Sequence, residues 1–135
     1  MFLIDNETGR VVYSTLKQSD FGTSLTRGPY KITALARAFQ SCRETGDTDS
    51  VCLTDFEAYE PSLGAPAAFM ASPINDRKAR VGVLAFQLSI DEVDPVVSGN
   101  KGWEKDGLGK TGDTSIVGPD FLMRTNSRGF AEDPE

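Results

Sequence analysis

Two short apolar runs at the start of the chain are separated by turn-forming residues. Phe2–Asp5 is apolar, Asn6–Gly9 is polar and ends in glycine, and Arg10–Ser14 is rich in β-branched and aromatic residues. Two such runs joined by a glycine-containing loop of about four residues are typical of a β-hairpin. The pattern therefore predicts an antiparallel pair of strands.

A single amphipathic helix is predicted after a polar stretch. Leu16–Arg27 is polar and irregular, and we expect a loop there. Tyr30–Arg43 follows, with Pro29 near its first turn. Its apolar side chains recur at intervals of three or four residues, which puts them on one helix face; they are Ile32, Leu35, Ala36 and Phe39. Residues 44–50 are polar again and indicate a second loop.

Three more apolar segments predict strands at Val51–Phe56, Ala67–Ser72 and Arg80–Leu88. Glu57–Pro66 holds two prolines and a glycine, which favours a surface connection, and Asn75–Lys78 is a turn. The order is strand, strand, helix, strand, strand, strand. A five-stranded antiparallel sheet with a helix on one face satisfies this order, so the predicted fold class is α+β.

The C-terminal part of the chain has a different pattern. Ser89 followed by acidic residues predicts a short helix, and residues 98–113 form a linker rich in glycine and lysine. Residues 114–124 predict another hairpin, which repeats the first in outline. We therefore divide the chain into a first module at 1–97, a linker at 98–113 and the start of an incomplete second module at 114–135.

Composition excludes several classes of function. The chain has 135 residues, a net charge of -6 and no histidine. A protein without histidine has no Ser-His-Asp or Cys-His nucleophile and no imidazole metal ligand. An acidic surface is a poor partner for nucleic acid, and the longest apolar stretches are too short to cross a membrane. We expect a module that is not an enzyme and has no cofactor, no metal and no nucleic-acid partner.

Two motifs leave alternatives open. Gly107–Gly112 matches G-x-G-x-x-G, but a linker precedes it and a β-like run follows, so a flexible loop is favoured over a nucleotide site. Cys42 and Cys52 are ten residues apart. They are two unrelated buried thiols in a reducing compartment, or a disulfide in an oxidising one.

Candidate binding residues lie around the proline- and glycine-rich connection. Tyr59 is an aromatic residue in that segment, where binding residues concentrate, and its other interpretation is a core side chain. Asp55 stands beside Phe56 and Tyr59, so its carboxylate could hold an ammonium group, although acidic residues at strand ends are more often solvated. No residue pattern in this region indicates an activated nucleophile.

Several runs resemble the Cache family of PAS-like extracytoplasmic sensor domains. They include Phe2–Ser14, Asp20–Leu25, Leu35–Phe39, Asp55–Phe69 and Val81–Leu88. Residues 107–114, together with 117–120 and 123–128, resemble the junction that leads into the second module of a double Cache sensor. On this interpretation the glycine run is a turn before a strand.

The resemblance implies a five-stranded PAS-like sheet with flanking helices, plus the opening hairpin of a second module. It also implies that a small molecule binds between the concave sheet face and the segments covering it, residues 16–50 and 57–66. The expected pocket wall is Tyr13, Tyr30, Phe69 and Phe86, and the expected polar or orienting groups are Asp55, Tyr59 and Ser72. The identity of the ligand does not follow from the resemblance.

The implied parent protein is a membrane-anchored bacterial receptor, first of all a methyl-accepting chemotaxis protein, and alternatively a sensor histidine kinase or receptor cyclase. The chain would then be its periplasmic or extracellular portion, with a homodimer allowed in the full receptor. Two features depart from the family: no long N-terminal helix precedes the first strand, and the second module ends after its hairpin, so the chain resembles an excised or incomplete piece. The alternatives are a structural or protein-interaction module without a small-molecule ligand, and a cytoplasmic PAS-like or roadblock/profilin-like module.

Overall fold

The computed structural model describes residues 1–77 and 79–133. Lys78, which belongs to the predicted turn 75–78, and the last two residues of the predicted second module lie outside the described residues. The chain forms two compact units, Met1–Leu88 and Ser89–Glu135. The helix after Ser89, which the sequence analysis assigned to the first module, groups with the second unit. Each unit is described by itself.

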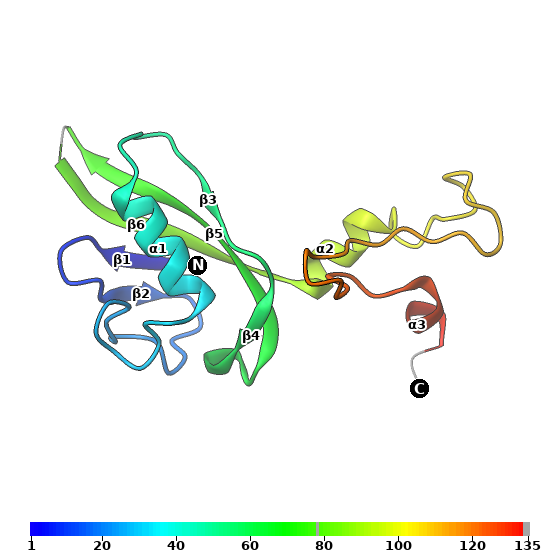
Figure 1. The fold of residues 1–135 in the computed structure, drawn as a ribbon, viewed down its shortest axis with the longest axis horizontal. Helices are drawn as coiled ribbons and strands as arrows, with labels where there is room; N and C mark the ends of the chain where they lie inside the picture. Colours follow the sequence, from blue (N-terminus) through cyan, green and yellow to red (C-terminus); the bar gives the residue numbers. More distant parts are fainter. Residues whose placement is uncertain (78, 134–135) are drawn as a thin grey trace. The chain divides into compact units, whose positions relative to one another are not determined.

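The first unit contains an antiparallel sheet, as Figure 1 shows. Its strands follow the order β2-β1-β6-β5-β3, and β4 also pairs with β5. The bounds are β1 (Phe2–Asp5), β2 (Val11–Ser14), β3 (Cys52–Leu53), β4 (Glu57–Tyr59), β5 (Ala65–Asp76) and β6 (Ala79–Ser89). The α+β class is confirmed, whereas the predicted five strands are six in the structure.

The predicted strand 51–56 is divided in the structure. β3 pairs with Met70 and Ala71, whereas β4 pairs with residues 65–67. Both strands therefore pair with β5, at different positions along it. Thr54 spans the gap: its N–H donates to the Phe69 carbonyl at 2.9 Å, and its hydroxyl accepts from the Phe69 N–H at 3.0 Å. The segment 57–66 is therefore not wholly a surface connection, because it begins with β4 and a 3₁₀ helix (Glu60–Ser62) before entering β5.

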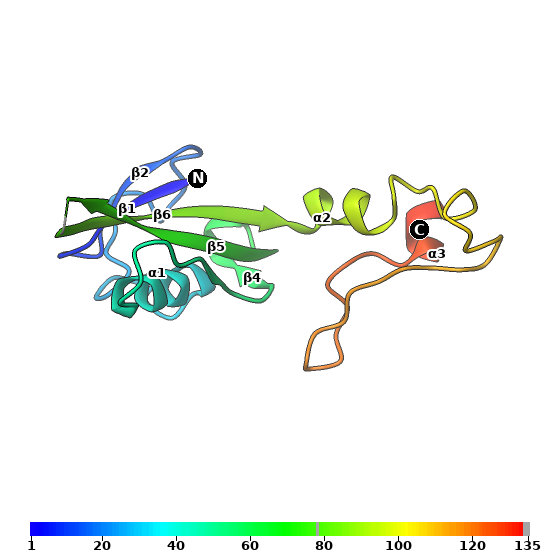
Figure 2. The same cartoon turned by 90° about the horizontal axis from the view of Figure 1, so that it is seen from above.

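Helix α1 (Ala34–Glu44) covers one face of this sheet, as Figure 2 shows. It begins four residues later than predicted because Thr33 is the N-cap, with its hydroxyl accepting from the Ala36 N–H at 3.3 Å. The helix buries Leu35, Phe39 and Cys42. Phe69 of β5 is buried in the same core, which holds the apolar side chains of α1 and of one sheet face.

Residues 16–33 contain no helix or strand, as predicted for 16–27 but not for 30–33, yet part of the segment belongs to the core. Leu25 is completely buried, and its N–H donates to the Gly9 carbonyl at 2.8 Å. The Val11 N–H donates to the Thr23 carbonyl at 2.9 Å, so the segment also follows the outer edge of β2. The irregular segment is thereby held in a defined path by backbone hydrogen bonds.

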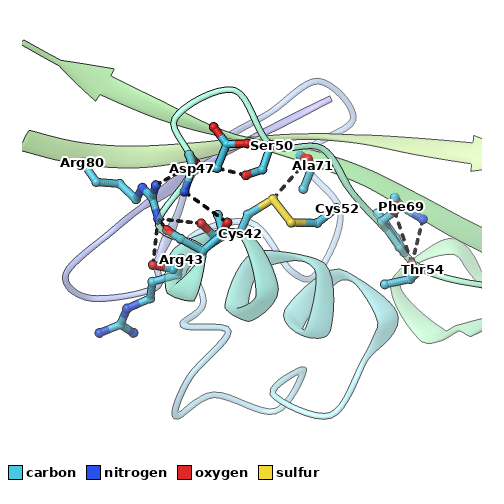
Figure 3. The surroundings of a disulfide bond; sticks show 10 residues. Cys42, Arg43, Asp47, Ser50, Cys52, Thr54, Phe69, Ala71 and Arg80 are labelled. Carbon is cyan, nitrogen blue, oxygen red and sulfur yellow. Dashed lines mark hydrogen bonds between the residues drawn. A yellow bond between two sulfur atoms is a disulfide. The ribbon is translucent and has the colours of Figure 1, made fainter.

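The cysteines form a disulfide between α1 and β3, which decides the alternative left open by the sequence (Figure 3). The Cα atoms of Cys42 and Cys52 are 5.8 Å apart, within the range that a disulfide requires. Arg80 of β6 reinforces the same end of the helix, since its guanidinium donates to the carbonyls of residues 42, 43, 45 and 47. The C-terminal end of α1 is therefore fixed covalently and by hydrogen bonds.

The second unit contains α2 (Ile90–Val97) and α3 (Arg128–Glu132). Ser89 and Glu92 form a capping box at the start of α2. The two strands predicted for a hairpin at 114–124 do not form. Within residues 98–133 the structure has no strand, only an isolated antiparallel bridge between Val117 and Met123. No helix formed by the described residues is both long and apolar enough to cross a membrane.

Candidate functional site

A buried carboxylate and a buried phenol meet on the helix-covered side of the sheet. Tyr59, at the end of β4, donates its hydroxyl hydrogen to Asp20 Oδ2 at 2.5 Å. Tyr59 is 1% exposed and Asp20 is 0% exposed. The other carboxylate oxygen of Asp20, Oδ1, has no hydrogen-bond partner among the described residues. An unpartnered buried carboxylate oxygen is costly and marks a place where a donor is missing.

Local structure fixes both groups. The Asp20 carbonyl accepts from the Thr23 N–H at 3.0 Å and from the Thr23 hydroxyl at 2.7 Å, which closes a turn in the 16–33 segment. The Tyr59 ring packs edge-on against Phe69, with centroids 4.9 Å apart. Burial raises the pKa of Tyr59 far above its ordinary value, and the hydrogen bond to Asp20 raises it further. Tyr59 is therefore a neutral donor at physiological pH.

The segments that carry this pair also hold other polar side chains that are hydrogen-bonded to one another. The Tyr30 hydroxyl donates to Ser19 Oγ at 2.8 Å. Ser62 Oγ donates to Gln18 Oε1 at 3.2 Å and accepts from the Gln87 amide at 3.1 Å. We name the set Gln18, Ser19, Asp20, Tyr30, Tyr59, Ser62 and Gln87 the polar cluster.

The polar cluster draws residues from the 16–33 segment, β4, the 3₁₀ helix and β6. It combines one carboxylate with hydroxyl and amide groups. A carboxylate pairs with an ammonium group, and hydroxyl and amide hydrogens bind carboxylate or carbonyl oxygens. The chemistry suits a small polar molecule that carries both.

The structure brings together only part of the predicted site. Tyr30, Tyr59 and Phe69 are buried on the face covered by α1. Tyr13 and Phe86 are each 42% exposed. Phe86 follows the buried Ala85, so it points to the opposite sheet face.

Two predicted polar groups also lie apart from the polar cluster. Ser72 and Phe86 line a separate shallow pocket of about 90 Å³ together with Val51, Met70, Ala71 and Leu84. Asp55 is exposed between β3 and β4, and its carboxylate accepts from the Phe56 N–H at 2.7 Å. The seven predicted residues therefore belong to more than one surface of the sheet, and their binding roles stay predictions.

Sequence reasoning missed Asp20. It lies in the polar segment 16–27, where an aspartate followed by Phe-Gly-Thr looks like an ordinary turn residue. The predicted turn does form, but it places the Asp20 carboxylate in the interior, where it accepts from the Tyr59 hydroxyl. The available signal was the Asp20–Leu25 run of the Cache resemblance, which marks the segment without assigning a role to its aspartate.

The comparisons with known proteins give a structural match without a sequence match. No protein-family model matches the chain, and no curated protein matches its sequence. The ligand-binding domain of the Pseudomonas fluorescens chemoreceptor CtaA in complex with L-serine has a TM-score of 0.57 and 16% sequence identity, over 93% of this chain and 46% of that one. The same domain in complex with L-leucine gives a TM-score of 0.55 and 16% identity, over 93% and 44%.

The chain has the fold of a Cache-type sensor domain. The expected fold is thereby confirmed, since a match at this level of identity speaks for the fold alone. The chain spans less than half the length of the CtaA domains that it matches. Among the described residues, no group of three or more Cys, Asp or Glu side chains is placed to hold a metal ion.

Proposed function

We propose that the chain is the ligand-sensing portion of the extracytoplasmic region of a bacterial transmembrane receptor, first of all a chemoreceptor. It binds a small molecule and transmits a conformational signal across the membrane. The similar fold of the CtaA ligand-binding domain supports this proposal. The observation that carries it is the buried Asp20 carboxylate, whose Oδ1 has no partner among the described residues.

The proposed ligand is an amino acid or a related primary amine. Its ammonium group would supply the hydrogen that Asp20 Oδ1 lacks, while Tyr59 holds the carboxylate through Oδ2. Two structures of the similar CtaA domain contain L-serine and L-leucine, which supports this ligand class. Tyr30 and Phe69 remain the proposed wall of the site, and Asp55 a proposed outer orienting group.

The disulfide supports the proposed location outside the cytoplasm. Disulfides persist in oxidising compartments and are rare in the cytosol. The Cys42–Cys52 bond therefore favours the periplasmic or extracellular placement over a cytoplasmic PAS-like or roadblock/profilin-like module.

The remaining parts of the proposal concern the parent receptor. Ligand binding would shift the 16–33 segment, and residues 89–112 would carry the signal toward the membrane. The region from 114 onward is proposed as the beginning of a second module, and the full receptor as a homodimer. A non-catalytic role without nucleic acid belongs to the same proposal.

The test is a thermal-shift screen of the full chain against the common L-amino acids, followed by isothermal titration of each compound that raises the melting temperature. We expect at least one to bind. Asp20→Asn keeps the shape of the side chain but removes its charge, and should weaken binding at least about tenfold because a charge-assisted hydrogen bond is lost. Tyr59→Phe should also weaken binding, since Asp20 Oδ2 loses its donor and the carboxylate is no longer held in position.

Asp55→Ala is the control that separates the two carboxylates. Loss of binding in Asp20→Asn with a clearly smaller loss in Asp55→Ala supports the Asp20 site, since Asp55 is given only an outer orienting role. The reverse result moves the site to the Asp55 surface and contradicts the role given to the polar cluster. Circular dichroism of each variant verifies that the fold is retained.

One observation favours a second candidate function, a protein-interaction module without a small-molecule ligand. Phe69 is completely buried and packs edge-on against Phe2 as well as Tyr59, so apolar rings fill the space between α1 and this part of the sheet. Failure of every amino acid in the screen to raise the melting temperature of the folded wild-type chain would favour this function.

A further inference from the structure

Three arginines converge on a cleft that plays no part in the proposed amine site. The cleft has a volume of about 490 Å³ and is lined by Arg10, Arg27, Arg43, Ser24, Thr26 and Thr8. Glu7 lies at the same cleft. We call this the arginine cleft. With three guanidinium groups and one carboxylate it carries a formal charge of +2, in a protein whose net charge is -6.

The three guanidinium groups are available to a ligand. Arg10, Arg27 and Arg43 are exposed, and none of them forms an ion pair with another described residue. Arg43 lies over the Phe39 ring at 5.9 Å, a contact that orients it without neutralising its charge.

The end of α1 does not need Arg43 as a cap. A helix C-terminus attracts cations through its unpaired carbonyls. Here Arg80 takes those carbonyls: Nη1 donates to Cys42 O at 2.8 Å and to Thr45 O at 2.6 Å. Figure 3 shows the Arg43 side chain directed away from Arg80 and from the disulfide. The helix therefore presents Arg43 to the cleft and not to its own backbone.

Two glycines allow the walls of the cleft to approach one another. Gly9 has a φ of +65°, and a Cβ there would lie 2.8 Å from Thr26 Cγ2. A Cβ on Gly28 would lie 2.5 Å from the Ser24 carbonyl oxygen. Gly9 therefore lets the β1–β2 turn lie against Thr26, and Gly28 lets the 24–28 turn close on itself.

Hydrogen bonds then fix these turns to each other. Ser24 Oγ donates to the Thr8 carbonyl at 2.8 Å, and Arg10 forms a backbone bridge with Ser24. Arg10 and Arg27 are thus held on two tied turns, while Arg43 comes from the last turn of α1. The cleft is framed by fixed backbone, and only the arginine side chains need to adjust to a ligand.

We propose that the arginine cleft is a second binding site of the first unit, which takes a small anion with two or more negative charges. Guanidinium groups recognise carboxylate and phosphate in the same bidentate manner. The volume is in the range of pockets that hold metabolite-sized molecules, which run from about 300 to 1,000 Å³. Di- and tricarboxylates and phosphorylated metabolites share this chemistry.

The site is separate from the polar cluster. Arg43 lies in the last turn of the 11-residue helix α1, whereas Tyr30 of the polar cluster precedes its N-terminus. A helix of that length spans about 16 Å. The two sites share no lining residue, so each can bind or fail to bind independently of the other.

The experiment is a titration of the full chain at low ionic strength with four probes: succinate, citrate, inorganic phosphate and pyrophosphate. We expect saturable one-to-one binding of at least one probe, weakened by added sodium chloride because exposed charges are screened. Comparing the affinities of the carboxylates with those of the phosphates shows which class of anion the cleft prefers.

Variants locate the binding. Arg10→Gln, Arg27→Gln and Arg43→Gln should each weaken it about fivefold, and the triple variant should abolish it. Arg43→Lys keeps the charge and should retain most of the affinity. Arg77→Gln removes an exposed arginine that does not line the cleft and is the matched control, and Tyr59→Phe should leave anion binding unchanged.

Two results overturn the proposal. One is the absence of saturable binding by all four probes while circular dichroism reports a folded chain. The other is unchanged affinity in the triple variant, which would place any bound anion elsewhere on the surface.

Discussion

The disulfide makes a large and measurable contribution to the stability of the first unit. Cys42 and Cys52 are separated by 10 residues in sequence. In the chain-entropy account, closing a loop of that size restricts the unfolded chain enough to stabilise the fold by about 2.7 kcal/mol. For a unit of this length, each kcal/mol corresponds to about 4–8 °C in melting temperature. Reduction should therefore lower the melting temperature by about 10–20 °C.

The assay is thermal unfolding followed by circular dichroism, with and without a phosphine reductant. A Cys42→Ala/Cys52→Ala double variant should melt slightly below the reduced wild type. Cys42 is completely buried, and shortening it leaves a small cavity that costs about 1 kcal/mol. The double variant should not respond to the reductant, which controls for effects of the reagent on the rest of the chain.

The refuting result is specific. If mass spectrometry shows both thiols free and the melting temperature of the wild type has not moved, the tie between α1 and β3 contributes nothing to stability. The reasoning from loop closure would then be wrong for this unit. A fall that appears equally in the double variant would assign the effect to the reagent.

Three further predictions concern single side chains. The raised pKa of Tyr59 means that the contribution of this side chain to stability is complete below pH 10. Above pH 10 the free energy of unfolding should fall by about 1.4 kcal/mol per pH unit, because only the unfolded phenol ionises there. Urea denaturation at increasing pH should show this fall in the wild type but not in Tyr59→Phe. Arg80→Met should destabilise the first unit by about 1–2 kcal/mol in urea denaturation, since partly buried carbonyls at the end of α1 lose their donor. Arg128→Ala removes the guanidinium that lies 4.9 Å from the centroid of the buried Trp103 ring, so Trp103 fluorescence should shift to longer wavelength while the circular dichroism of the sheet is retained. An unshifted spectrum would contradict the shielding of Trp103 by Arg128.

The sequence predicted the fold of the first unit well because its signals are local. The turn at Asn6–Gly9 and the spacing of apolar residues along α1 are visible without any tertiary information. The split between β3 and β4 was not predictable in this way. It depends on the Thr54 hydroxyl meeting the Phe69 backbone, 15 residues away along the chain.

The predicted site combined residues that lie on opposite faces of the sheet. The run Val81–Leu88 is apolar at nearly every position, so it has no alternation from which to read the direction of Phe86. Only pairing with β1, where Phe2 stands opposite Ala85, determines which side chains enter the core. Asp20 was missed for the converse reason, since its burial arises from a distant phenol and not from its neighbours in sequence.

The two ends of α1 are anchored very differently. The C-terminal end carries the disulfide and the contacts of Arg80, whereas the N-terminal end continues directly into the 16–33 segment and is capped by Thr33. A helix that is anchored more firmly at one end tilts about that end. We therefore expect any ligand that opens the polar cluster to tilt α1 about Cys42, and reduction of the disulfide to leave the hydrogen bonds of Arg80 as the remaining anchor of that end.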